Sequence, residues 1–192
     1  MFDKPYSFQK LSTSKTFLNN PVEKTNYRFK AAQRTYFLTL EIFDFGLAAV
    51  KYCDVKDKDS RSAYKKIFND YDAFRVIGTC LHIMLHYWKE HPFTSFAFYA
   101  VARDLNEMTD RNKKLKGKAL QAYVEKYRKV RFRIYEEAML NLFSPQYFTH
   151  VSDKKNDVYL LINKKQPDYR VMIQNTAAYL LENYDLLFND DV

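Results

Sequence analysis

Glycine is scarce in this chain of 192 residues, and its scarcity argues against two classes of enzyme. The three glycines, Gly46, Gly78 and Gly117, are each isolated. A phosphate-binding P-loop and the dinucleotide-binding fingerprint G-x-G-x-x-G both need clustered glycines, because the backbone must approach the phosphates closely. The sequence therefore all but excludes enzymes that use these two motifs, and we expect no cofactor.

Cysteine is also rare, with Cys53 and Cys80 as the two examples. Both lie in apolar segments, and their spacing matches neither a disulfide framework nor a metal site. Neither has the electropositive, exposed setting of a nucleophile, and no Ser/His/Asp arrangement can be proposed. We expect both to be reduced core thiols of a cytoplasmic protein.

Long apolar runs are missing as well. No segment approaches the roughly 18 to 20 apolar residues needed to span a bilayer. The first residues, MFDKPYSFQKLSTSK, contain no apolar core of a signal peptide. We therefore expect no membrane span. What the chain does contain is 47% hydrophobic and 17% aromatic residues, enough to form a sizeable core.

Positive charge is concentrated in one stretch, residues 111–133, RNKKLKGKALQAYVEKYRKVRFR. It holds ten Lys or Arg and one acid, Glu125, for a net charge of +9, whereas the whole chain is +8. The remaining residues carry 21 bases and 22 acids and are close to neutral. A charge this localised predicts a polyanion, an acidic protein surface or a membrane face as partner. The rings and bases are not segregated onto two faces, which argues against anionic lipid.

Hydrophobic patterning predicts a single α+β domain over residues 25–188, after a partly extended N-terminal arm (1–24) and before an acidic tail (189–192). The expected architecture is a mostly antiparallel sheet of five to six strands with about three main helices packed on it. Alternation and short apolar runs predict strands at 26–31, 35–43, 45–55, 94–102, 146–152 and 157–163. Helical spacing and stop signals predict helices at 73–90, 118–143 and 169–188, with a short helix at 62–69.

The strand at 94–102 is almost continuously apolar, as is typical of a central strand covered on both faces. The helix before it links two strands, which predicts a crossover that places this strand in the middle of the sheet.

Residues 129–135, KVRFRIY, support two interpretations. They alternate strictly, so as a strand they would place Lys129, Arg131 and Arg133 on one face. The helix is favoured because residues 136–140 have high helix propensity and no turn residue separates the two segments.

A narrow polar stripe runs along the helix expected at 73–90. Its members follow one another at steps of three or four residues, and they are Arg75, Thr79, His82, His86 and Lys89. His82 and His86 have the i, i+4 spacing of a metal-chelating pair. The residues between them lack the glutamate that acts as base in zinc proteases, and His91 is the only further ligand nearby. A polar seam is therefore favoured over a metal site, for which His82 and His86 are weak candidates.

A weaker pattern suggests a metal-dependent nuclease. Asp44 and the triplet Asp54-Val55-Lys56 stand ten residues apart at adjacent strand ends. Some nucleases use a similar Asp and Asp-x-Lys to hold Mg²⁺ and to position a water. Because a D-x-K triplet is common by chance, Asp44, Asp54 and Lys56 are weak catalytic candidates and this function ranks third.

Several short motifs in a fixed order carry a family resemblance. They are DAFRVIGT at 72–79, a helix that ends at His91-Pro92, FAFY at 96–99, and an Arg- and Tyr-rich helix with YRK at 127–129 and RIY at 133–135. Over roughly residues 27–143 this order resembles a group of small uncharacterised proteins from gut Bacteroidota, from which the basic residues 111–118 depart. The resemblance implies an α+β fold and a bacterial, cytoplasmic protein, and it implies no activity.

Two non-catalytic functions rank above the nuclease. The first is binding of DNA or RNA by residues 111–135, where tyrosines and a phenylalanine alternate with the bases. The expected contact residues are Arg128, Lys129, Arg131, Arg133, Lys113, Lys114, Lys116, Lys118 and Tyr127.

The second non-catalytic function is that of a protein-interaction module of inhibitor or immunity type that binds an acidic partner. The acidic end of the last helix, with Glu182 and Asp185, is a candidate to cover the basic stretch in the same molecule or in a homodimer.

Overall fold

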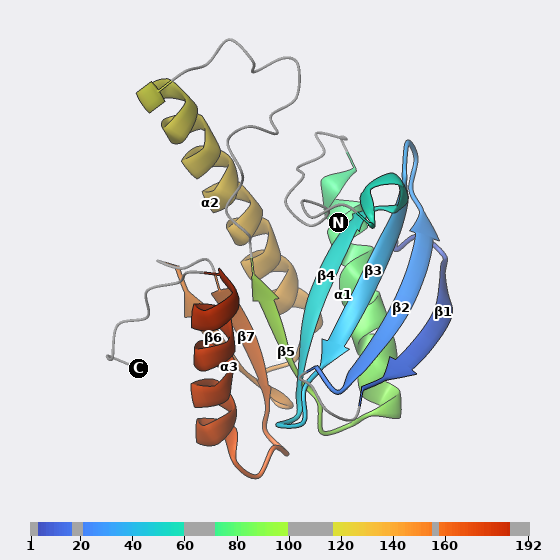
Figure 1. Ribbon diagram of the computed structural model, residues 1–192, viewed down its shortest axis with the longest axis vertical. Helices are drawn as coiled ribbons and strands as arrows, with labels where there is room; N and C mark the ends of the chain where they lie inside the picture. The colour runs from blue at the N-terminus through green and yellow to red at the C-terminus, as the bar shows by residue number, and fades with distance from the viewer. Residues whose placement is uncertain (1–3, 17–20, 60–71, 100–116, 155–157, 185–192) are drawn as a thin grey trace.

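A computed structural model describes residues 4–16, 21–59, 72–99, 117–154 and 158–184 (Figure 1). In chain order the elements are β1 (Phe8–Lys15), β2 (Glu23–Lys30), β3 (Thr35–Ile42), β4 (Leu47–Asp54), the 3-10 helix η1 (Val55–Asp57), α1 (Ala73–Glu90), β5 (Ser95–Tyr99), α2 (Gly117–Leu142), β6 (Phe148–Asp153), β7 (Val158–Asn163) and α3 (Tyr169–Tyr184). None of these helices is long and apolar enough to cross a membrane. The short helix predicted at 62–69 lies outside the described residues.

The described strands form one seven-stranded sheet in the order β1-β2-β3-β4-β5-β7-β6. Neighbours are antiparallel except β4 and β5, which are parallel. Helix α1 connects that parallel pair, because parallel neighbours need a crossover connection. The α+β class, the crossover and the central position of β5 are confirmed, and the sheet has more strands than the predicted five to six.

Strand β1 lies in the segment that the sequence predicts to be an arm. It forms one edge of the sheet, and its register with β2 runs from Phe8 opposite Phe29 to Lys15 opposite Glu23. Every residue after Phe8 is exposed, so the strand lacks the alternation of apolar and polar residues that would reveal it. Pairing with β2 therefore makes this segment a strand. Lysines on β1, at the open edge of the sheet, disfavour pairing of this edge with another chain.

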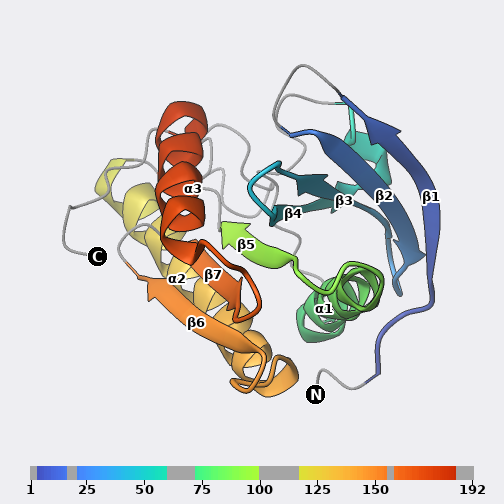
Figure 2. The ribbon, with the colours of Figure 1, turned by 90° about the horizontal axis from the view of Figure 1, so that it is seen from below.

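Helices α1 and α2 pack on one face of the sheet, and α3 packs on the other (Figure 2). The larger core lies under α1 and α2, where Leu38, Leu81 and Phe96 are fully buried. A smaller core under α3 consists of Phe43, Leu47, Ala97, Val158, Leu160, Ile162 and Met172. Among the described elements, no helix covers the α3 side of β1, β2 and β3 (Figures 1 and 2).

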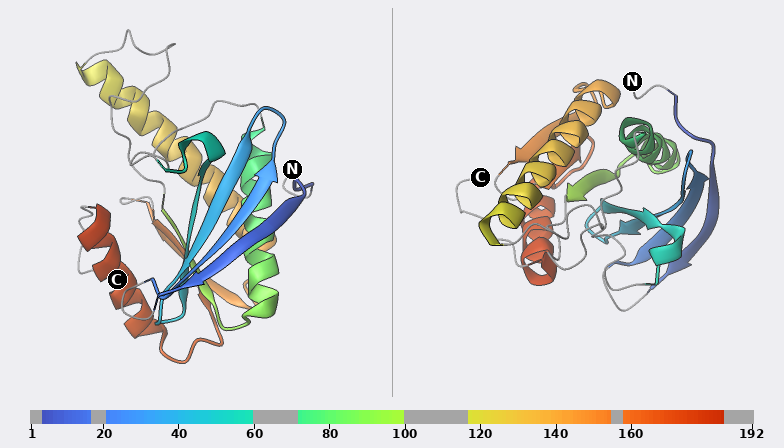
Figure 3. Two further views of the ribbon diagram at one scale, coloured as in Figure 1. Left: turned by 45° about the vertical axis from the view of Figure 1, so that its right-hand side comes forward. Right: turned by 90° about the horizontal axis from the view of Figure 1, so that it is seen from above.

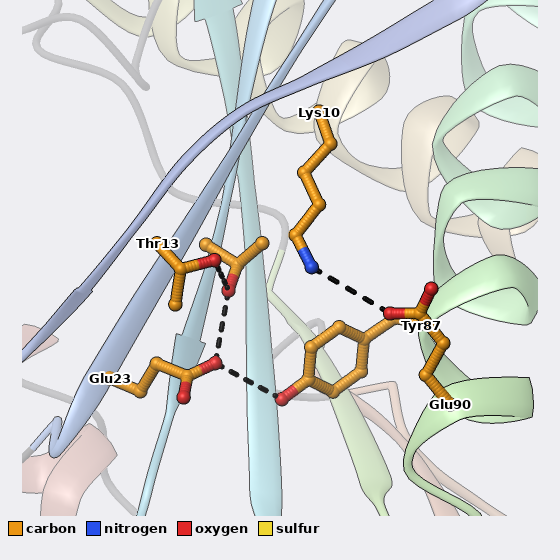
Figure 4. A network of polar contacts seen from close by, with 6 residues as sticks. Lys10, Thr13, Glu23, Tyr87 and Glu90 are labelled. Carbon is orange, nitrogen blue, oxygen red and sulfur yellow. Dashed lines mark hydrogen bonds and ion pairs between the residues drawn. The ribbon is translucent and has the colours of Figure 1, made fainter.

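A polar network joins β1 and β2 to the last turns of α1 (Figure 4). The Tyr87 hydroxyl donates to the Glu23 carboxylate at 3.5 Å, and Lys10 forms an ion pair with Glu90 at 3.6 Å. Burial, with the Glu90 and Glu23 carboxylates, raises the pKa of Tyr27 to about 12, and burial and Glu23 also raise the pKa of Tyr87. Both phenols therefore stay protonated at neutral pH, and the network ties α1 to the edge of the sheet.

Candidate nucleic-acid interface

Residues 117–133 of the basic stretch fold as part of helix α2, which confirms the helical interpretation of residues 129–135. The strand interpretation is wrong, because Phe132 is 4% exposed and Val130 is 45% exposed. Residues two apart would share a face in a strand, whereas in a helix they point in different directions. The C-terminal half of α2 packs on the sheet, and its N-terminal half extends beyond the sheet (Figures 1 and 3).

Four bases form a row along the exposed side of α2. Lys118, Lys126, Lys129 and Arg133 are all exposed, and steps of three, four and eight residues keep them on one face of the helix. At 1.5 Å per residue the row is about 22 Å long. We call these four residues the α2 row. Ala122 lies within the row and is exposed too.

Two of the aromatic side chains that alternate with the bases belong to the core. Phe132 lies 6.3 Å from the Tyr159 ring, and the Tyr135 ring lies 5.3 Å from Phe98. The Tyr135 hydroxyl also shares a hydrogen bond of 2.8 Å with the Tyr52 hydroxyl. These two rings therefore fasten α2 to the sheet and do not form a stacking platform for bases.

Several predicted contact residues lie outside what the structure describes. They are Lys113, Lys114 and Lys116, together with the side chains of Tyr127, Arg128 and Arg131. Of the predicted acidic cover, the side chain of Glu182 and the whole of Asp185 lie outside it as well. Helix α3, which contains Glu182, packs on the face of the sheet opposite to α2.

The three nuclease candidates are not brought together. Asp44 is exposed in the turn between β3 and β4, whereas Asp54 ends β4, and the register of this hairpin places them at opposite ends. The length of β4 separates them by roughly 20 Å or more. Asp54 is buried and accepts hydrogen bonds from the backbone N–H of Lys56 at 3.0 Å and from Arg34 at 3.2 Å. Its carboxylate caps η1, so the prediction of a shared Mg²⁺ site is wrong.

The histidine pair gains no third ligand from the part of the chain that the structure describes. Among the described residues, no three His, Cys, Asp or Glu side chains are placed to hold a metal ion. The ring of His86 packs edge-on against Phe8 at 5.8 Å. The N-terminal segment crosses the polar stripe of α1, where the backbone N–H of Tyr6 donates to Thr79 at 2.9 Å and Arg75 lies 3.9 Å above the Tyr6 ring. The stripe therefore binds the chain's own N-terminal segment.

Both cysteines are buried and form no disulfide, as the sequence predicts. Burial, with the Asp57, Asp54 and Asp59 carboxylates nearby, raises the pKa of Cys53 to about 12. A thiol with so high a pKa is a poor nucleophile at neutral pH, because the thiolate is the reactive form.

A second basic surface, which the sequence analysis missed, lies on the α3 side of the sheet, over strands that no described helix covers. Lys24, Arg28 and Lys30 alternate along β2, so they share this face. The Glu41 carboxylate binds Lys24 at 3.1 Å and Lys51 at 2.6 Å. Burial alone would raise the pKa of Glu41, but the ammonium groups of Lys51 and Lys24 outweigh it and hold the pKa below its usual value. The signal in the sequence was the alternation of bases with Tyr and Phe in EKTNYRFK.

Comparison with known proteins assigns neither a family nor a function to the chain. No protein-family model, curated protein or solved structure matches the chain. The resemblance to proteins of gut Bacteroidota stays a prediction, and the function has to be argued from the site itself.

Proposed function

We propose that this protein binds nucleic acid through its phosphate backbone, with the α2 row as the contact surface. The observation that supports this proposal is the exposure of four bases in one row on a helix that extends beyond the sheet (Figure 3). A duplex carries one phosphate per about 3.4 Å of axis on each strand, so a row about 22 Å long spans several phosphates. Contacts of this kind supply affinity and position without reading the sequence.

Backbone contact is favoured over base stacking because two of the four rings on which the stacking hypothesis rests, Phe132 and Tyr135, are buried. DNA and RNA present the same phosphate charge, so we expect both to bind with weak sequence preference. With four bases on phosphates, log K should fall with log salt at a slope of about −2.8 to −3.6.

The test is a fluorescence-anisotropy titration of labelled DNA and RNA oligonucleotides at two or more salt concentrations. The variant carries Lys118→Glu, Lys126→Glu and Arg133→Glu, three exposed positions at which glutamate keeps the helix propensity high. We expect the affinity at low salt to fall by at least about tenfold and the salt slope to shrink by about one per base removed.

A matched control carries Lys58→Glu, Lys164→Glu and Lys165→Glu, which change the net charge equally at exposed positions away from α2. This control should bind much more tightly than the α2 variant. Failure of the wild-type protein to bind any oligonucleotide at low salt would exclude the proposal, and equal weakening in both variants would show that only net charge matters.

An acidic protein partner is the second candidate, and two exposed apolar side chains favour it. Val130 is 45% exposed and Leu140 is 57% exposed, and both lie on the outer side of α2 beside the bases. Apolar contacts flanked by charges are typical of protein interfaces. Leu140→Ser should weaken a complex with an acidic protein and leave oligonucleotide binding unchanged.

A further inference from the structure

An open cavity of about 390 Å³ lies where β1 begins, β2 ends and β3 begins. Its lining residues are Ser7, Phe8, Gln9, Arg28, Phe29, Lys30 and Thr35. The pairings of Phe8 with Phe29 and of Lys30 with Thr35 bring the three strand ends together. Small-molecule sites have volumes of about 300 to 1,000 Å³, so this cavity is large enough for a small ligand.

Alternation along the strands sorts the lining residues into two sets. The rings of Phe8 and Phe29 belong to the α1 side, where Phe8 packs against Tyr27 and His86 and where Phe29 is 2% exposed. The polar lining residues alternate with these rings and therefore share the α3 side of the sheet, on the part over β1, β2 and β3 that no described helix covers. They are Ser7, Gln9, Arg28, Lys30 and Thr35.

The polar set has the chemistry of an anion site. Arg28 and Lys30 are exposed cations two residues apart, and no carboxylate is among the lining residues. The guanidinium of Arg28 has five N–H donors, and its hydrogen bond to Gln9 at 3.4 Å uses one of them. The hydroxyls of Ser7 and Thr35 add two further donors at the rim.

The neighbouring cations on the same face differ from Arg28 and Lys30 because they form ion pairs with a carboxylate. Lys24 and Lys51 are held by the Glu41 carboxylate, which neutralises much of their charge. Arg28 and Lys30 have no ion pair with any acid that the structure describes. The net positive charge of this face is therefore concentrated at the cavity, and a planar guanidinium matches two phosphate oxygens at once.

We propose that this cavity binds a phosphate group, either as inorganic phosphate or as the phosphate of a nucleotide. Arg28 holds two of the phosphate oxygens, Lys30 balances the remaining charge, and the Thr35 and Ser7 hydroxyls donate at the rim. The proposal is independent of the proposed function of α2, because the cavity and the α2 row share no residue.

Isothermal titration calorimetry in phosphate-free buffer tests the proposal with inorganic phosphate, adenosine monophosphate and adenosine. We expect saturable binding of the two phosphate compounds and none of adenosine. The double variant Arg28→Gln with Lys30→Gln should weaken binding by about tenfold or more, because it removes charge-assisted hydrogen bonds. The charge-matched control Lys164→Gln with Lys165→Gln should bind as the wild type does.

Comparison of the ligands also identifies the source of the phosphate. Equal affinity for both phosphate compounds indicates recognition of the phosphate group alone, and tighter binding of the nucleotide indicates a nucleotide site. Backbone amide shifts at Arg28, Lys30 and Thr35 during a phosphate titration of the wild type should locate the ligand independently of any variant.

Three results would overturn the proposal: no saturable binding of either phosphate compound, adenosine binding as tightly as its monophosphate, or an unchanged affinity in the double variant. The α2 variant with Lys118→Glu, Lys126→Glu and Arg133→Glu should retain phosphate binding. Failure of nucleic-acid binding by α2 and failure of the phosphate site are therefore separate outcomes.

Discussion

Glu41 lies on β3 between two lysines, and only 7% of its surface is exposed. Its carboxylate binds Lys51 and Lys24 and lies 3.5 Å from the Tyr179 hydroxyl of α3. A buried carboxylate is stable only when it is paired, and removing its charge breaks its ion pairs with both lysines. This one residue therefore joins strands β2, β3 and β4 to one another and to helix α3.

Glu41→Gln should lower the free energy of unfolding at pH 7 by about 1 to 3 kcal/mol, because the charged hydrogen bonds to Lys51 and Lys24 are lost. The folded-state pKa of Glu41 is lowered, so its contribution is present above the unfolded pKa and is lost as the pH falls through the folded pKa. Urea denaturation at pH 7 and at decreasing pH should show the two proteins converge in acid. Equal stability at pH 7 would contradict this account.

His150 is the second residue whose ionisation is tied to the fold. Its Nε2–H donates to the Phe143 carbonyl at 3.0 Å, since a carbonyl can only accept. Its Nδ1 is then the acceptor for the Tyr159 hydroxyl at 2.9 Å. Burial lowers the pKa of His150, although the bond to the Phe143 carbonyl opposes this effect. Protonation would place a second N–H against the Tyr159 hydroxyl, so the neutral ring fits this site.

Stability should therefore fall as the pH decreases through the ordinary histidine pKa near 6.5, because the unfolded chain binds the proton more readily than the folded one does. Urea midpoints measured from about pH 7.5 to about pH 5 check the effect. In His150→Gln the decrease should be smaller than in the wild type. His86→Gln, at an exposed position, is the control and should keep the wild-type decrease.

At the scale of one element, α2 divides into a packed half and a projecting half. Phe132→Ala should lower the free energy of unfolding by about 3 to 5 kcal/mol, because it opens a cavity in the core. Val130→Ala, at a position that is 45% exposed, should change stability by less than about 0.5 kcal/mol. A strand would place both residues on one face, so similar losses at the two positions would contradict the helix. Thermal and urea unfolding measure both variants.

The elements with a strong apolar period could be predicted from the sequence, and β1 could not. Helix α1 was predicted with its observed bounds because Pro92 follows a long helical pattern. Strands β3 to β5 could be predicted because they are largely buried, and buried strands consist of apolar runs. Every residue of β1 after Phe8 is exposed, so its sequence shows no apolar alternation. The segment is a strand because it pairs with β2, and this pairing cannot be read from the local sequence.

At the scale of the whole molecule, positive charge occupies two separate surfaces. The α2 row lies on a helix that packs on one face of the sheet, and the cavity at Arg28 and Lys30 opens on the other face. The charge count of the chain points to the first surface alone, because ten of its 31 bases lie within residues 111–133. The second surface is assembled from three strands, and β2 contributes only Lys24, Arg28 and Lys30 to it, a far smaller excess of bases than in residues 111–133.

The sequence by itself determined the α+β class, the helices and central strand, the buried thiols and the place of the main basic stretch. These properties follow from composition and from the local periodicity of apolar residues, which depends on the geometry of helices and strands. Only the tertiary structure decided which bases share a face, that Phe132 and Tyr135 enter the core, that Asp44 and Asp54 lie apart, and that Ser7, Arg28 and Thr35 meet. Such relations depend on strand register and on which helix covers which face, and these arise from contacts between residues far apart in the chain.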